Sequence, residues 1–132
     1  MIFRYARHTQ NLEKLIGFYT KVLDFKILGD FKEHNAYDGV FLGKENENWH
    51  LEFTQNNEIP ESEFDEDDIL VFYPESLEEF QKIVDNLELF KVPILQPKNL
   101  YWKENGICFE DCDHYKIIVS GLRIKKPLGK KS

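Results

Sequence analysis

The chain has 132 residues, of which 42% are hydrophobic and 14% aromatic, enough for one domain with a substantial core. Its formal net charge is −7, from 24 acidic and 17 basic side chains, and this argues against nonspecific binding to nucleic acid or anionic membranes. The opening MIFRYARHTQ lacks the apolar run of a signal peptide, and no stretch approaches about 20 apolar residues. We therefore expect a cytoplasmic protein with neither nucleic acid nor membrane as a partner.

The first half of the chain predicts a strand, a helix and three further strands. The first strand is expected at 2–9, and Asn11 is a suitable N-cap for a helix over 11–25. An apolar stripe follows this helix at Leu12, Leu15, Ile16, Tyr19, Val22 and Leu23. Three short segments rich in aromatic and branched residues then predict strands at 25–31, 36–43 and 49–55.

The second half predicts the same order of elements. A polar, acidic stretch over 56–68 indicates a linker, and a strand follows it at 69–73. Ser76 and Glu79 form a capping box at the start of a second helix. The buried side of this helix is expected to carry Leu77, Phe80, Val84 and Leu87. The last strands are expected at 91–96, 107–111 and 115–121.

The two halves also share sequence. NLEKLIGFYTKVLDF (11–25) and SLEEFQKIVDNLELF (76–90) carry apolar residues at matching positions. Two strand segments recur as well, because GVF and HLEF of the first half correspond to GIC and KIIV of the second. The repeat is too long, and occurs too few times, for a solenoid. It indicates duplication within one domain, with two small sheets that together enclose a cleft.

This duplication, with the segments NLEKLIGFY, HLEFTQ and EDCDHYKIIV, resembles the vicinal oxygen chelate superfamily, which includes glyoxalase I, extradiol dioxygenases and bleomycin-resistance proteins. The chain is similar in particular to small glyoxalase-like proteins of uncertain function that carry YDGV, HLEFTQ and YWKENG. The resemblance implies an α+β fold in which two tandem βαβββ modules, each with strand order 1-4-3-2, form a curved mixed-sheet trough. Module one would span 1–55 and module two 69–122 of a single domain over 1–122, followed by a basic flexible tail at 123–132.

The resemblance also implies metal ligands on the first and last strands of each module. These positions fall on Arg4, Glu52, Ile69 and Ile118. Of the four side chains, only Glu52 can donate a lone pair to a metal. The two cysteines, in CFEDC, have no second pair to complete a zinc site. We therefore expect no metal and no other cofactor, and a salt bridge between Arg4 and Glu52 if both face the trough.

A nonstandard site for Zn, Ni, Mn or Fe remains an alternative. His50 lies two residues before Glu52, so both side chains share one face of an extended strand. His8 lies four residues after Arg4 and would share that face near the end of its strand. A carboxylate with imidazoles suits these divalent ions.

Three aromatic residues are further candidates for ligand binding. Tyr37 lies in AYDGV, and Tyr101 and Trp102 lie in NLYWKENG, which is expected to form a strand and a turn. Aromatic rings with a polar tip suit the mouth of a ligand cleft, although such residues are more often part of a core.

Two functions follow from these residues. The first is binding of a small organic ligand, as in the bleomycin-resistance proteins, by a homodimer of this chain. The ligand would contact Arg4, His8, Tyr37, His50, Glu52, Tyr101 and Trp102, and the acidic balance would favour a cation. The second is a metal-dependent enzyme of the glyoxalase I (lactoylglutathione lyase) or dioxygenase type, with Glu52 as catalytic base. An arginine beside Glu52 would weaken it as a base, which favours the first function.

Overall fold

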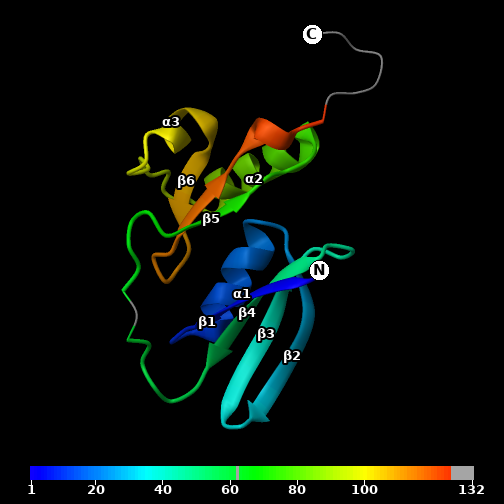
Figure 1. The fold of residues 1–132 in the computed structure, drawn as a ribbon, viewed down its shortest axis with the longest axis vertical. Coiled ribbons are helices and arrows are strands. Elements are labelled where there is room, and N and C mark those ends of the chain that lie inside the picture. Colours follow the sequence, from blue (N-terminus) through cyan, green and yellow to red (C-terminus); the bar gives the residue numbers. More distant parts are fainter. Residues whose placement is uncertain (62, 126–132) are drawn as a thin grey trace. The chain divides into compact units, whose positions relative to one another are not determined.

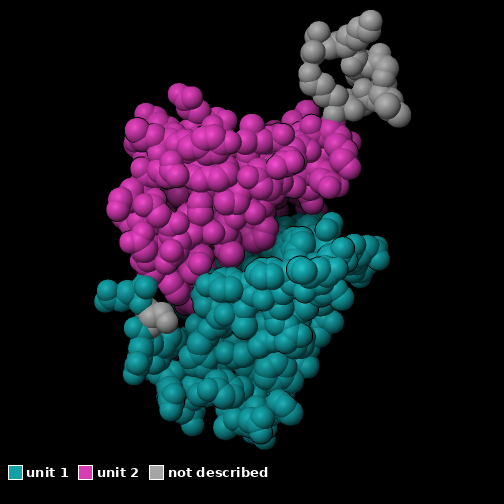
Figure 2. Space-filling view, in the orientation of Figure 1, with its two compact units in different colours: residues 1–63 teal, residues 64–132 magenta. Residues whose placement is uncertain are grey.

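The computed structural model describes residues 1–61 and 63–125. The chain divides into two compact units (Figure 2). Unit 1 spans Met1–Glu63 and unit 2 spans Phe64–Ser132. Among the described residues, no helix combines the length and the apolar character needed to cross a membrane.

Unit 1 is a four-stranded sheet with one helix (Figure 1). Its elements are β1 (Phe3–His8), α1 (Leu12–Lys21), β2 (Lys26–His34), β3 (Tyr37–Gly43) and β4 (Trp49–Gln55). The strand order is β1-β4-β3-β2, in which β1 is parallel to β4 and the other neighbours are antiparallel. This confirms for unit 1 the order 1-4-3-2 that the resemblance implied.

The helix of unit 1 begins where its cap was predicted. The Asn11 side chain accepts a hydrogen bond from the Lys14 amide at 3.1 Å, which satisfies one of the free donors at the helix start. Leu15 and Tyr19 are 0% exposed, and the Tyr19 ring lies 5.1 Å from that of Phe53 on β4. Each such buried side chain stabilises the fold by about 1.5–3 kcal/mol. The apolar stripe of α1 is therefore what holds the helix on the sheet.

Alternation along β4 divides its side chains between the two faces of the sheet. Leu51 and Phe53 are buried on the face that α1 covers. His50 and Glu52 alternate with them and so project from the opposite face. The predicted shared face of His50 and Glu52 is confirmed, and it is the face without the helix.

Unit 2 repeats this plan with one strand fewer. Its elements are β5 (Ile69–Phe72), α2 (Leu77–Leu89), α3 (Tyr101–Asn105), β6 (Ile107–Glu110), β7 (Lys116–Val119) and a short 3-10 helix at Gly121–Arg123. The sheet order is β5-β7-β6. The strand predicted at 91–96 is wrong, because Leu95 makes only an isolated bridge to Cys108. Pro93 lies inside that segment and has no N–H to donate to a ladder.

The second helix differs from its prediction in which side is buried. Ser76 caps it as expected, since its Oγ accepts from the Glu79 amide at 3.1 Å. Ile83 and Leu87 are buried, whereas Leu77, predicted to face inward, is 66% exposed. At about 100° per residue, Leu77 points about 120° away from Ile83 around the helix axis. The prediction that Leu77 belongs to the buried side of the helix is therefore wrong.

The predicted connections fall partly outside the described residues. The described residues of the expected linker (56–68) form no helix or strand. Of the predicted tail at 123–132, Arg123 ends the 3-10 helix and residues 126–132 lie outside the described part of the chain. The division into a single domain with modules at 1–55 and 69–122 stays a prediction.

Candidate functional site

The register of the unit 1 sheet gathers polar side chains on its helix-free face. In the β1–β4 pair, Arg4 lies opposite His50 and Ala6 opposite Glu52. Side chains two residues apart share a face, so Arg4, His50 and Glu52 project together. Phe41 of β3 lies opposite Glu52 and joins them. We name Arg4, Phe41, His50 and Glu52 the Arg4 cluster.

The Arg4 guanidinium holds this cluster together. Its Nη1 donates to Glu52 Oε1 at 2.9 Å, and its Nε donates to His50 Nε2 at 3.0 Å. Its Cζ lies 4.9 Å from the centre of the Phe41 ring, and the His50 ring meets the same ring edge-on at 5.5 Å. The predicted salt bridge between Arg4 and Glu52 is confirmed.

The bond from Arg4 indicates which nitrogen of the His50 ring acts as acceptor. A guanidinium can only donate, so His50 Nε2 must be the acceptor and carry no hydrogen. The ring hydrogen is then on Nδ1. Nδ1 has no hydrogen-bond partner among the described residues. His50 therefore offers an uncommitted N–H donor within the cluster.

The two charges of the cluster differ in exposure. The side chain of Glu52 is 14% exposed, whereas that of Arg4 is 52% exposed. Arg4 thus covers the carboxylate and keeps part of its own guanidinium in water. An ion pair with one partner this exposed contributes at most about 1 kcal/mol to stability. The fold therefore gains little from this pair, and its donors remain accessible.

The donor set of the Arg4 cluster, as it lies, does not fit a divalent metal ion. Its two candidate ligand atoms, His50 Nε2 and Glu52 Oε1, both accept hydrogen bonds from Arg4. Among the residues that the structure describes, no three His, Cys, Asp or Glu side chains gather closely enough to hold an ion. The nonstandard site of His8, His50 and Glu52 is therefore not assembled.

His8 instead forms a second polar group on this face, with Tyr37. Its Nδ1 lies 3.0 Å from Thr54 Oγ1, and its Nε2 lies 3.0 Å from Asn56 Oδ1. Its ring meets that of Tyr37 edge-on at 5.8 Å. His8 and Arg4 are four residues apart on β1, so the two groups share one face of the sheet. Ligand contacts by His8 and Tyr37 stay predictions.

The two aromatic candidates of unit 2 lie on a helix, and the strand predicted for them is wrong. Asn99 Oδ1 accepts from the Tyr101 amide at 3.1 Å, a local side-chain bond that favours a turn and starts α3. The rings of Tyr101 and Trp102 meet edge-on at 4.9 Å. Tyr101 is 55% exposed, and Trp102 is half-buried. Their part in ligand binding stays a prediction.

Sequence analysis missed the aromatic floor of the unit 1 face. A Cβ on Gly29 would lie 3.2 Å from the Phe41 ring, and one on Gly39 would lie 2.2 Å from the Phe31 ring. Both rings therefore lie directly over glycines and form a floor beside Arg4. Alternation along YDGVFLG predicts that Phe41 and Gly39 share a face of the strand. Only the register of β3 against β4, however, shows that Phe41 lies opposite Glu52.

Comparison with known proteins adds a family to this geometry. Residues 3–54 match the YycE-like N-terminal domain, and residues 67–120 match the YycE-like C-terminal domain. The uncharacterized protein YycE of Bacillus subtilis is 35% identical over 120 residues, which cover 87% of this chain and 84% of that protein. A crystal structure of YycE from Bacillus subtilis, a protein of unknown function whose description suggests a glyoxalase or fosfomycin resistance protein, matches with a TM-score of 0.78 and 34% identity. The match covers 98% of this chain and 93% of that one.

More distant structures share the fold alone. The trypanothione-dependent glyoxalase I of Leishmania major matches with a TM-score of 0.70 at 23% identity, covering 92% of this chain and 86% of that one. A variant of the fosfomycin resistance protein FosX from Listeria monocytogenes, in complex with Mn(II) and a dihydroxypropylphosphonic acid, matches with a TM-score of 0.63 at 12% identity. That match covers 89% of this chain and 88% of FosX.

Proposed function

From the premise that the chain belongs to the YycE-like family of the vicinal oxygen chelate superfamily, we propose that it binds a small organic ligand at the Arg4 cluster without the superfamily's usual metal. The observation that carries this proposal is the position of Arg4. Its guanidinium stands where the resemblance implies a metal ligand, and it bonds to both His50 and Glu52. The positively charged guanidinium therefore lies between His50 and Glu52, where a metal cation would have to bind.

The free donors of the cluster favour a ligand with a hydrogen-bond acceptor. A guanidinium has five N–H donors, and the bonds to His50 and Glu52 use two of those of Arg4. His50 adds its Nδ1 hydrogen, and the rings of Phe31 and Phe41 provide a flat apolar surface beside these donors. A carbonyl or carboxylate group on a planar body would use both features. The overall negative charge would favour a cation, but the local donors outweigh it because they act at contact distance.

The alternative function is a metal-dependent glyoxalase-like enzyme with Glu52 as base. FosX, which contains Mn(II), is one of the proteins that share the fold. Because the Arg4 side chain is 52% exposed, it has room to turn outward and release His50 and Glu52 as ligands. The alternative therefore requires Arg4 to leave the position that it holds between them.

The ligand proposal is tested with phenylglyoxylate, an aromatic keto acid with a planar benzoyl group and a carboxylate. We expect it to raise the thermal midpoint of the chelator-treated protein and to shift the amide resonances of β1, β3 and β4. Arg4→Met should weaken its binding at least tenfold. Glu47→Gln, an exposed side chain in the turn between β3 and β4, is the control and should bind as the unchanged protein does. Equal binding by Arg4→Met would overturn the proposal.

The metal alternative is tested on the same protein with Zn, Ni, Mn, Co and Fe(II). A ligand present at a hundredfold excess over its Kd stabilises the folded protein by about 2.7 kcal/mol. We expect no metal to raise the midpoint in this way. A rise that disappears in both His50→Ala and Glu52→Ala would establish the alternative and overturn binding without metal.

We also propose that the protein is a homodimer, as the resemblance implied. Light scattering coupled to size-exclusion chromatography should then give twice the chain mass of 15.8 kDa. The single-chain mass at concentrations well above those used for ligand titration would overturn this proposal.

A further inference from the structure

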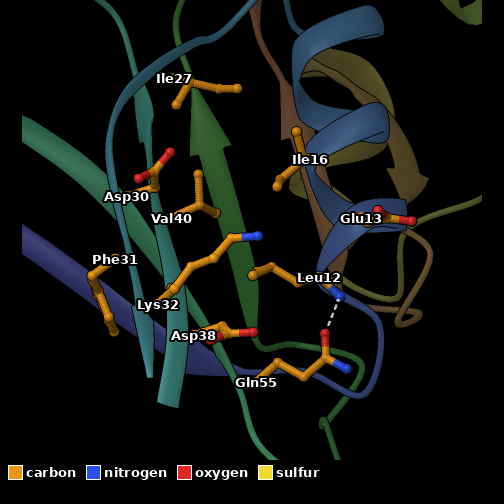
Figure 3. Close-up of a pocket in the computed structure, with 11 residues that line it drawn as sticks. Leu12, Glu13, Ile16, Ile27, Asp30, Phe31, Lys32, Asp38, Val40 and Gln55 are labelled. Carbon is orange, nitrogen blue, oxygen red and sulfur yellow. Dashed lines mark hydrogen bonds between the residues drawn. The ribbon is translucent and has the colours of Figure 1, made fainter. Parts of the chain in front are cut away.

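A hollow lies on the face of the unit 1 sheet opposite the Arg4 cluster. It is a pocket of about 270 Å³ between α1 and the strands β2 and β3 (Figure 3). Val40, which lines it, alternates with Phe41 along β3, so the pocket and the Arg4 cluster lie on opposite faces. Every lining residue belongs to unit 1. The pocket is therefore on the face opposite the proposed site, although Phe31 and Gly39 of the strands between them also line it.

The pocket exists because the helix does not cover the whole sheet. α1 packs over β3 and β4, while β2 lies at the edge of the sheet beyond β3. An irregularity between Ile27 and Gly29 adds one residue to β2. Residues three apart would normally face opposite ways, but this extra residue turns Ile27 and Asp30 to the same side. The bulge thus places an acidic side chain next to an apolar one at the pocket wall.

The floor of the pocket is apolar. Leu12 and Ile16 from α1 face Ile27 and Val40 from the strands (Figure 3). Val40 is 2% exposed and belongs to the core, but Ile27 is 53% exposed. An aliphatic ligand group placed between the helix and β2 would remove this exposed surface from water, at about 25 cal/mol per Å².

Charges of both signs surround this floor. Asp30, Asp38 and, in the first turn of α1, Glu13 supply carboxylates, and the Lys32 side chain extends from β2 toward α1 (Figure 3). Neither the Asp30 carboxylate nor the Lys32 ammonium forms an ion pair or hydrogen bond with another described residue. Asp38 accepts one bond, from the Glu33 amide at 2.9 Å. The pocket therefore presents an uncommitted anion and an uncommitted cation at one apolar surface.

The start of α1 adds to the positive side of the pocket. The Leu12 amide donates a hydrogen bond to Gln55 Oε1 at 2.8 Å and is therefore not available to a ligand (Figure 3). The helix dipole nevertheless leaves partial positive charge at this end of α1. Lys32 and the helix start together favour a ligand carboxylate, while Asp30 and Asp38 favour a ligand ammonium.

We propose that this pocket binds a small zwitterion with an aliphatic body, of the kind represented by a free apolar amino acid. Its carboxylate would lie toward Lys32 and its ammonium toward Asp30, with the aliphatic group on Ile16 and Ile27. The volume of about 270 Å³ is below the range of about 300–1,000 Å³ for drug-sized ligands, which fits a molecule of this size.

The first test compares three probes that share the isobutyl group of leucine on the full chain: L-leucine, isopentylamine, which lacks the carboxylate, and 4-methylpentanoate, which lacks the ammonium. Amide shifts of α1 and β2 in two-dimensional NMR give the Kd of each. We expect leucine to bind at least tenfold more tightly than either probe with one charge. If isopentylamine or 4-methylpentanoate binds as tightly as leucine, the pocket recognises one charge and the proposal is wrong.

Two substitutions then separate the charges. Lys32→Met should weaken leucine binding at least fivefold and strengthen isopentylamine, because it removes the partner of the carboxylate and a repulsion on the ammonium. Asp30→Asn should also weaken leucine but strengthen 4-methylpentanoate. Lys21→Met and Glu47→Gln make the same charge changes outside the pocket and should alter no Kd. The proposal is supported if, in each variant, the Kd of leucine rises while the Kd of the singly charged probe falls. It is overturned if both Kd values change equally.

Discussion

Unit 1 and unit 2 use the same strand register with different side chains. In unit 1, Arg4 lies opposite His50 and Phe41 opposite Glu52. The corresponding pairs of unit 2 are Ile69 with Lys116 and Cys108 with Ile118. The register is thus common to both copies, and the polar cluster belongs to the first copy alone.

The second copy has made two of the four equivalent positions, those of Phe41 and Glu52, part of its core. Ile118 is 0% exposed and Cys108 is 3% exposed. Burial raises the pKa of the Cys108 thiol, so it stays protonated and unreactive at neutral pH. The charges that unit 2 does carry on these strands, Lys116 and Glu110, pair with each other. The comparison teaches that a duplicated backbone does not preserve the chemistry of a site.

The largest expected effect comes from giving unit 2 the carboxylate of unit 1. Ile118→Glu places a carboxylate in a fully buried position, and the apolar Ile69 stands where Arg4 lies in unit 1. An uncompensated buried charge costs about 3–5 kcal/mol. Urea unfolding at neutral pH measures this loss, and Glu52→Ile, the reverse change in unit 1, should cost no more than about 1 kcal/mol.

A double variant sharpens this test. Ile69→Arg with Ile118→Glu recreates the spacing of Arg4 and Glu52 in unit 2. The pair should recover part of the stability lost in Ile118→Glu, since the new charge gains a partner. If the double variant is less stable than Ile118→Glu, or if Glu52→Ile costs as much as Ile118→Glu, the two positions are not equivalent.

Two equivalent glycines provide a smaller comparison. A Cβ on Gly106 would lie 2.5 Å from Cγ2 of Ile118, a buried branched side chain that cannot move. A Cβ on Gly39 would lie 2.2 Å from the tip of the half-buried Phe31 ring, which can swing away. Gly106→Ala should therefore cost about 1–3 kcal/mol and Gly39→Ala less.

Hydrogen exchange of the backbone amides measures, for each sheet separately, the loss of protection that each glycine substitution causes. Faster exchange in β6 and β7 is expected for Gly106→Ala, with β1 and β4 unchanged. For Gly39→Ala, slow exchange should persist in both sheets. Greater loss of protection for Gly39→Ala would show that the Phe31 ring is held more firmly than Ile118.

Much of the fold could be predicted from local patterns in the sequence. The caps at Asn11 and Ser76 were predicted because they depend on side chains within three residues of one another. The shared face of His50 and Glu52 was predicted because side chains alternate along any extended strand. The salt bridge of Arg4 and Glu52 followed once the resemblance made their strands neighbours.

The rest depends on facts that no local pattern contains. Phe41 enters the cluster through the register of β3 against β4. The pocket beside Asp30 exists because β2 takes one extra residue against β3. Gly29 in KILGDF is a residue type common at bulges, but it does not say which residue is extra or which side chains it turns to one face. The strand predicted at 91–96 failed for the opposite reason, since Pro93 was visible in the sequence but outweighed by its apolar neighbours.

The smallest expected effect is the pH dependence of the stability that the Lys116–Glu110 ion pair gives to unit 2. Burial raises the pKa of the Glu110 carboxyl, but the hydrogen bond and positive charge of Lys116, joined by His114, lower it further than burial raises it. The folded protein therefore binds this proton less readily than the unfolded chain does. The pair stabilises the fold above the ordinary pKa of the carboxyl, and this contribution is lost as the pH falls through the lowered value.

Glu110→Gln should consequently cost about 0.2–1 kcal/mol at neutral pH and almost nothing once the native carboxyl is protonated. Urea unfolding of both proteins at pH values on either side of the lowered pKa measures the difference. Glu104→Gln, a change of the same kind in α3, is the control and should give no such pH dependence. A cost for Glu110→Gln that persists in acid would mean that Glu110 acts through its packing, and that the half-buried Lys116 is held by something other than their opposite charges.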